Sequence, residues 1–277
     1  MTLSARNNYF KAGIVLAVLS LGLAAAGGYF AFPAFSEASA AAVTRSGGII
    51  LKLIEGFAEP SAHVPLWVVL ASVVYSFISI ILIYYFFEKT QSPEILFIGL
   101  FVISVAFELA KLAIPLRVVF PFSSVYLVVA NRVMLFGRYF GLLSLFAASV
   151  YAAGLDSQKQ YNIFLMFVMA TLVITLNIPV DSLAWDSSFK LQNSYHAMFT
   201  LVEIGFFAMT ALTFMVTAYI RSSRRYIYIG IGALMMLTGR NIMFHSDTWI
   251  SPAPGLVLLA AGTWIVCSRL HKEYLWL

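Results

Sequence analysis

Charged residues are scarce in this chain. Only 10% of its 277 residues are Asp, Glu, Lys or Arg, and 61% are hydrophobic; soluble domains carry about 25% charged residues. So little polar surface excludes a soluble globular protein and indicates a helical protein that crosses a lipid bilayer several times. The net charge of +5 does not indicate nucleic-acid binding, because no basic stripe interleaved with aromatic residues is present on a polar scaffold.

Cysteine and catalytic signatures are also scarce. The single cysteine, Cys267, lies in the last apolar segment and excludes an intrachain disulfide. The chain lacks the Gly-x-Ser-x-Gly, phosphate-loop and dinucleotide-binding motifs, and it has no Cys/His cluster or His-Glu-x-x-His motif. The sequence therefore predicts no catalytic residue, no cofactor and no metal site, and no motif ties the chain to a known family.

Long apolar segments alternate with short polar breaks from end to end. A helix needs about 20 residues to cross the hydrocarbon core of a bilayer, and the segments approach or exceed this length. We therefore predict an all-α integral membrane protein, a single domain over residues 1–277 that forms a bundle of transmembrane helices. The predicted spans are 10–32, 64–87, 94–115, 125–154, 162–180, 195–220, 226–245 and 255–269.

The first span has two interpretations. Arg6 and Lys11 precede its apolar run, and Ala38-Ser39-Ala40 resembles a signal-peptidase site, so cleavage would leave seven spans. Its apolar core runs for about 21 residues before Pro33, which we expect to end the helix, whereas a signal peptide has about 7–15 apolar residues. The length favours a membrane anchor.

The segment 33–63 is the largest predicted loop. Apolar residues recur at helical spacing from Ile49 to Phe57, after Ser46-Gly47-Gly48 and before Pro60. This pattern predicts a short amphipathic helix on the outer membrane surface; a lid packed on the rim of the bundle is the alternative. The loop from Asp181 to Ser194 is expected either to cap a cavity in the outer half of the bundle or to form an inert turn.

The distribution of Lys and Arg predicts the orientation. These residues are more frequent in the segments that face the cytoplasm when the N-terminus is inside, and Arg221, Arg224 and Arg225 gather in one short loop. Cytoplasmic loops carry such an excess. We therefore expect both termini in the cytoplasm and the protein in the cytoplasmic (inner) membrane of a bacterium.

Several predicted spans contain ionisable side chains, although each costs about 2.5–3.5 kcal/mol at the membrane centre. With the orientation above, six of them fall in the outer half of the membrane: Glu108, Arg132, Arg138, Glu203, Arg240 and His245. This placement predicts one buried polar network or a cavity open to the outside. Glu203 has no basic residue within helical reach, so its partner must come from another span. Lys111, by contrast, is expected to extend to the headgroups. The candidate residues are Glu108, Arg132, Arg138, Glu203, Arg240, Asn241 and His245.

Gly137 and Gly141 form a small-xxx-small face around Arg138 that favours close helix packing. The predicted network has more guanidinium groups than carboxylates, which favours an anionic ligand.

Three functions are compatible with this pattern. We prefer a non-enzymatic sensor-like or accessory subunit that binds a ligand, a lipid or a membrane-protein partner through the network. The alternatives are a transporter of a small solute or ion and an intramembrane enzyme for lipid-linked phosphates. In the enzyme, Glu203 or Glu108 would act as general base and the arginines would bind phosphate.

Overall fold

A computed structural model describes residues 3–40, 59–61, 63–88, 90, 92–155 and 160–274. Within these residues, eight helices are long and apolar enough to cross a membrane. The prediction of an all-α multi-pass membrane protein is therefore confirmed. The amphipathic helix predicted between Ile49 and Phe57 lies outside the described residues.

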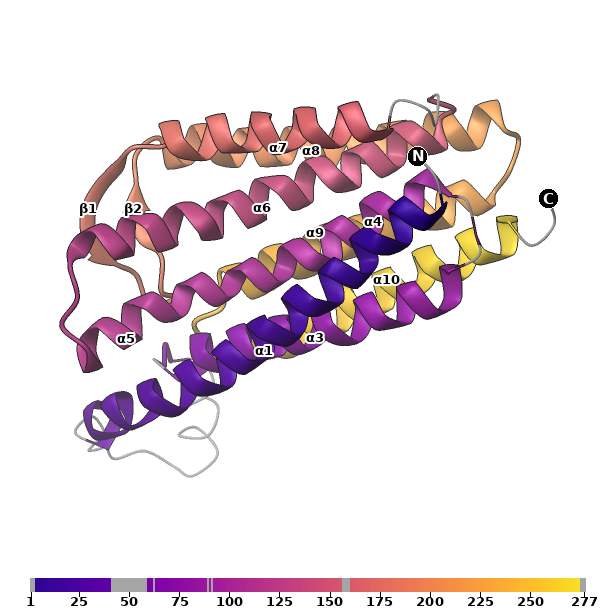
Figure 1. Cartoon of the computed structure of the whole chain (residues 1–277). Helices are drawn as coiled ribbons and strands as arrows, with labels where there is room; N and C mark the ends of the chain where they lie inside the picture. The colour runs from indigo at the N-terminus through magenta and orange to yellow at the C-terminus, as the bar shows by residue number, and fades with distance from the viewer. Residues whose placement is uncertain are drawn as a thin grey trace, which may run out of the picture.

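The helices form one elongated bundle (Figure 1). A small antiparallel hairpin, β1 (Val180–Trp185) and β2 (Leu191–Asn193), lies at one end of the bundle, and both chain termini lie at the other. We refer to these as the hairpin end and the terminal end. The helices are α1 (Leu3–Ala40), α3 (His63–Phe87), α4 (Pro93–Val105), η1 (Ala106–Leu112), α5 (Ala113–Val119), α6 (Ser124–Ala152), α7 (Gln160–Asn177), α8 (His196–Ile220), α9 (Arg225–Phe244) and α10 (Pro252–Tyr274).

Two helices continue past a proline. The expectation that Pro33 ends the first helix was wrong, because α1 continues to Ala40. Likewise the third span continues past Pro115 to Val119. A proline removes one backbone hydrogen bond and crowds the carbonyl four residues earlier, but neighbouring groups and local tightening accommodate this in membrane helices.

The tightening is visible in the third span. Its middle, η1, is a 3₁₀ helix that ends three residues before Pro115. Pro115 cannot donate to the carbonyl of Lys111, and a 3₁₀ segment replaces the bonding pattern that such a donor would complete. With three residues per turn, Glu108 and Lys111 lie one above the other on the same face of η1.

The helices divide into a packed interior and a periphery. In the most apolar stretches of α4–α5 and α6, 78% of the residues are buried, whereas in those of α7 and α8 only 11% are. The outer faces of α7 and α8 are therefore available to lipid. Helices α9 and α10 pack closely, since a side chain at Gly239 would meet the backbone of Gly255 at 2.7 Å. Glycine permits this approach because it has no Cβ.

Candidate functional site

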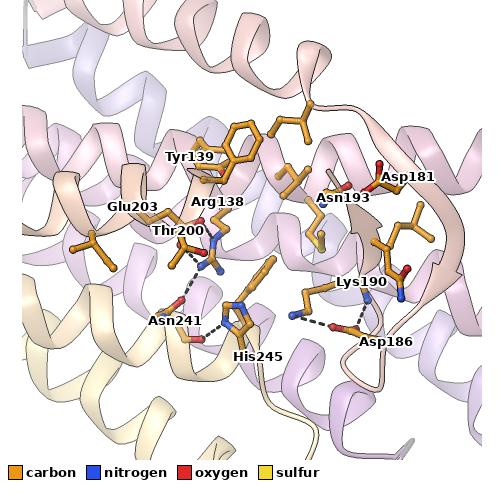
Figure 2. A pocket seen from close by; sticks show the side chains of 18 of the residues that line it. Arg138, Tyr139, Asp181, Asp186, Lys190, Asn193, Thr200, Glu203, Asn241 and His245 are labelled. Atoms are coloured by element: carbon orange, nitrogen blue, oxygen red, sulfur yellow. Dashed lines mark hydrogen bonds and ion pairs between the residues drawn. The ribbon is translucent and has the colours of Figure 1, made fainter. Parts of the chain in front are cut away.

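A cavity of about 700 Å³ lies beneath the β1–β2 hairpin (Figure 2). Residues from α6, α8, α9 and the hairpin line it, so elements that are distant in the sequence meet at one place. This volume is within the range of about 300–1,000 Å³ that is typical of small-molecule sites. Its lining includes apolar side chains together with Arg138, Glu203, Lys190 and His245.

Arg138 of α6 and Glu203 of α8 form a bidentate ion pair in the cavity wall. Arg138 Nε donates to Glu203 Oε1 at 2.6 Å, and Nη2 donates to Oε2 at 2.5 Å. The same Nη2 donates to Asn241 Oδ1 at 2.7 Å, which adds α9 to the arrangement. The Arg138 and Glu203 side chains are only 7% and 15% exposed, so water screens the pair weakly. The partner that Glu203 requires from another span is thus Arg138.

Three basic side chains surround the ring of Phe244, the last residue of α9. Arg138 Cζ lies 3.9 Å from the ring centroid, Lys111 Nζ 4.3 Å and Lys190 Nζ 5.4 Å. An aromatic face attracts a cation, and the attraction grows when water is excluded. Phe244 therefore helps to hold basic groups from α6, η1 and the hairpin next to one another.

The hairpin turn supplies a second ion pair to the cavity. Asp186 accepts hydrogen bonds from the backbone of Ser188 at 3.1 Å and of Lys190 at 3.0 Å, and its other oxygen lies 3.1 Å from Lys190 Nζ. Partial burial acts to raise the pKa of Asp186, but Lys190 and these hydrogen bonds hold it below its ordinary value. Burial lowers the pKa of Lys190, although Asp186 opposes this.

Side-chain hydrogen bonds connect the hairpin to the bundle at two places. Asn131 Nδ2 of α6 donates to Asn193 Oδ1 at 3.0 Å, and Ser187 Oγ donates to Asp247 Oδ2 after α9 at 2.7 Å. Asp181 at the start of β1 and Asn193 at the end of β2 both line the cavity. Of the two expectations for this loop, the geometry corresponds to the cap.

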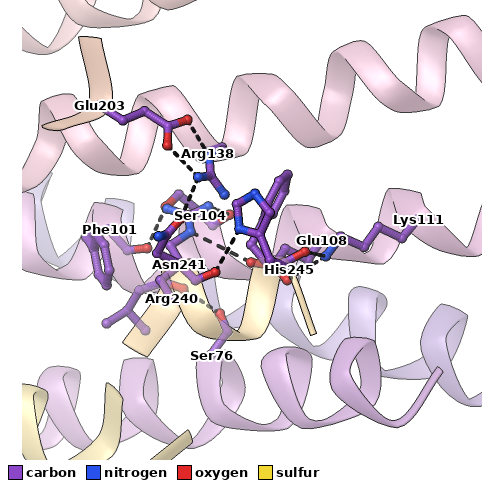
Figure 3. Close-up of polar contacts among 12 residues, drawn as sticks. Ser76, Phe101, Ser104, Glu108, Lys111, Arg138, Glu203, Arg240, Asn241 and His245 are labelled. Atoms are coloured by element: carbon purple, nitrogen blue, oxygen red, sulfur yellow. Dashed lines mark hydrogen bonds and ion pairs between the residues drawn. The ribbon is translucent and has the colours of Figure 1, made fainter. Parts of the chain in front are cut away.

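A second cluster of polar and charged side chains is buried behind the cavity wall (Figure 3). Arg240 Nη1 donates to Ser104 Oγ at 2.9 Å, and Nη2 donates to the Ser104 carbonyl at 3.1 Å. Its Nε lies 3.8 Å from Glu108 Oε1, and Lys111 Nζ lies 3.5 Å from Glu108 Oε2. Glu108 is therefore shared between two basic residues, with no hydrogen bond to either of its oxygens from the part of the chain that the structure describes.

The expectation that Lys111 extends to the headgroups was wrong. Its side chain is 2% exposed, and Nζ donates to the Phe244 carbonyl at 2.9 Å. This carbonyl belongs to the last turn of α9, where helix carbonyls lack intrahelical partners and attract cations. The sequence could not show that the end of α9 comes so close to η1.

Gly137 and Gly141 face the third span. A Cβ at Gly137 would overlap Phe107, and a Cβ at Gly141 would overlap the Arg240 guanidinium and Ser104. The absence of a side chain at Gly137 therefore allows close helix packing. At Gly141 it also leaves the space that the buried Arg240 guanidinium occupies.

The predicted residues fall into three sets. Arg138, Glu203, Asn241 and His245 line the cavity, and Glu108 and Arg240 form the layer behind it. Arg132, half buried in α6, makes no hydrogen bond or ion pair with any residue in the described ranges and lies apart from both groups.

Sequence reasoning missed Lys190, Asp186 and Phe244. The spacing of Asp186 and Lys190 in a polar loop was a weak signal, and Phe244 resembled any other apolar residue of its span. Among the described residues, no group of three or more His, Cys, Asp and Glu side chains is arranged to hold a metal ion.

Comparisons with known proteins add little to this geometry. No family model matches the chain. It is similar to a protein of Treponema pallidum (strain Nichols) named "uncharacterized protein", with 22% identity over 240 residues and 69% of each chain covered. This likeness is too low to show a family, and it carries no function to this chain.

Proposed function

We propose that this protein is a non-enzymatic sensor-like or accessory subunit of a membrane complex, and that it binds a small molecule or lipid headgroup in the cavity beneath the hairpin. The observation that carries the proposal is the convergence of Arg138 and Lys190, from separate elements, on one ring at the wall of this cavity. Both side chains can donate hydrogen bonds to an anionic group such as a carboxylate or a phosphate.

The position of the cavity supports a sensing role. A bound ligand would contact α6, α8, α9 and the hairpin together. A ligand that binds one arrangement of these elements better than another shifts the population toward it. A partner subunit that contacts the lipid-facing α7 or α8 would respond to such a shift.

The two alternative functions have weaker support. A transporter needs access from both ends of the bundle, whereas the lining of this cavity comes from the hairpin end and the middle. An enzyme that uses Glu203 as general base needs this carboxylate to approach a substrate proton, whereas both of its oxygens are held by Arg138.

Purification in mild detergent followed by native mass spectrometry tests the proposal. We expect the wild-type protein to retain a small molecule, a lipid or a stoichiometric protein partner, and Lys190→Met to retain less of the bound molecule. Arg132→Gln is the matched control, because Arg132 has no partner among the described residues. Solute uptake by proteoliposomes, or turnover of an added lipid phosphate, would contradict the proposal.

A further inference from the structure

The charged groups at the cavity balance one another. Apart from His245, the cavity lining and the layer behind it contain equal numbers of basic and acidic side chains. The basic groups are Arg138, Lys190, Lys111 and Arg240, and the acidic groups are Asp181, Asp186, Glu203 and Glu108. The excess of positive charge that the sequence suggested is therefore absent from this region, because Arg132 lies outside it and the carboxylates of Asp181 and Asp186 offset the amines of Lys111 and Lys190.

This balance restricts the chemistry of the ligand. A purely anionic ligand that took Arg138 from Glu203 would leave a carboxylate that is 15% exposed without its partner and next to a second negative charge. A ligand that carries both charges avoids this cost, since its anion replaces Glu203 at Arg138 while its cation replaces Arg138 at Glu203. No charge is then left unpaired.

Building on the proposed function, we propose that the ligand is a zwitterionic phospholipid whose headgroup joins a phosphate diester to a primary ammonium group. Arg138 and Lys190 bind the phosphate, and Glu203 accepts hydrogen bonds from the ammonium. A primary ammonium donates such bonds, whereas a quaternary one has no N–H to donate. Tyr139 and Phe199, whose ring centroids are 6.1 Å apart, line the same wall and provide aromatic faces for the cation.

The rest of the lining fits acyl chains. Ile204 of α8 lines the cavity and is 58% exposed. It lies within a predicted span on a helix whose most apolar stretch is only 11% buried, which puts this position next to the bilayer. Phe207, one turn further along α8, also lines the cavity. The cavity thus extends to the lipid-facing surface beside Ile204, where a membrane lipid enters with its chains remaining in the bilayer.

The test uses the full chain in mild detergent and native mass spectrometry with short-chain lipids. We expect dihexanoyl phosphatidylethanolamine to bind about tenfold more tightly than the phosphatidylglycerol analogue, a difference of about 1.4 kcal/mol, and more tightly than the phosphatidylcholine analogue. Glu203→Gln is expected to abolish the preference over phosphatidylglycerol, and Arg132→Gln is expected to leave it unchanged. Equal or tighter binding of phosphatidylglycerol would overturn this inference and leave the proposed function standing.

A second variant separates a lipid from a free headgroup. Ile204→Trp fills the lateral opening at an exposed position, so folding is expected to be preserved. It is expected to reduce lipid binding about tenfold or more and to reduce the binding of glycerophosphoethanolamine much less. Lipid binding unaffected by Ile204→Trp, or binding of glycerophosphoethanolamine alone, would overturn the lipid assignment. If the wild type binds none of these probes and retains no molecule or partner on purification, the proposed function fails as well.

Discussion

Arg240 of α9 occupies the space that a side chain at Gly141 of α6 would need. This relationship joins the helix-packing face predicted around Arg138 to the buried layer of charge, because the glycine lets a guanidinium lie between two helices. There it donates to Ser104 and approaches Glu108.

Gly141→Ala is expected to destabilise the protein. The added methyl group displaces Arg240, which costs about 1–3 kcal/mol in overpacking and a similar amount for hydrogen bonds lost from a charged group. Reversible unfolding by SDS titration measures this change. Gly28→Ala is the control, because nothing lies within 4 Å of a Cβ at Gly28, and we expect its stability to equal that of the wild type or exceed it by up to about 1 kcal/mol. Equal stability of the two variants would show that Arg240 does not depend on this space.

Arg138 and Glu203 are expected to be strongly coupled in stability. Replacing one member of a buried pair leaves a charge without its partner and costs about 3–5 kcal/mol, whereas replacing both by apolar residues costs much less. We therefore expect Arg138→Met and Glu203→Leu each to destabilise the protein and the double variant to recover most of the loss. A double-mutant cycle from SDS titrations gives the coupling energy. Strict additivity of the two losses would contradict the pairing, and Arg132→Gln provides a control for loss of a guanidinium alone.

Glu108 is expected to be more important than Lys111 for the buried layer. Glu108→Gln leaves both Lys111 and Arg240 without a nearby carboxylate, which predicts a loss of about 3–5 kcal/mol. Lys111→Met leaves Glu108 with Arg240 and removes one bond to the Phe244 carbonyl, so we expect a smaller loss. The midpoints of thermal unfolding in detergent test this order. A larger loss from Lys111→Met would assign the main role to its contact with α9.

The orientation of the bundle remains a prediction, and the lone cysteine makes it easy to test. In a Cys267→Ser background, Ala184→Cys places a thiol on the exposed hairpin and Ser222→Cys places one in the loop between α8 and α9. We expect a membrane-impermeant maleimide to label only the hairpin cysteine in intact cells. After the cells are opened, it should label both. Labelling of Ser222→Cys alone in intact cells would show that the orientation is the reverse of the predicted one.

The basic architecture could be predicted from the amino-acid sequence because bilayer insertion depends on local properties. A run of about 20 apolar residues satisfies its backbone hydrogen bonds as a helix and transfers favourably to lipid, whatever its neighbours are. The spans around α3, α6 and α8 are therefore close to their predicted bounds. Pro33 was less informative, since it was expected to end its helix and α1 continues to Ala40.

The sequence by itself determined that acids and bases such as Glu203 and Arg138 had to find partners within the membrane, because an unpaired charge there is costly. Only the tertiary structure decided which partners meet. Lys111 is buried against Phe244, Arg132 is left outside, and the hairpin contributes Lys190 and Asp186. These outcomes depend on distances between helices that are far apart along the chain, and residue spacing along one helix contains no information about such distances.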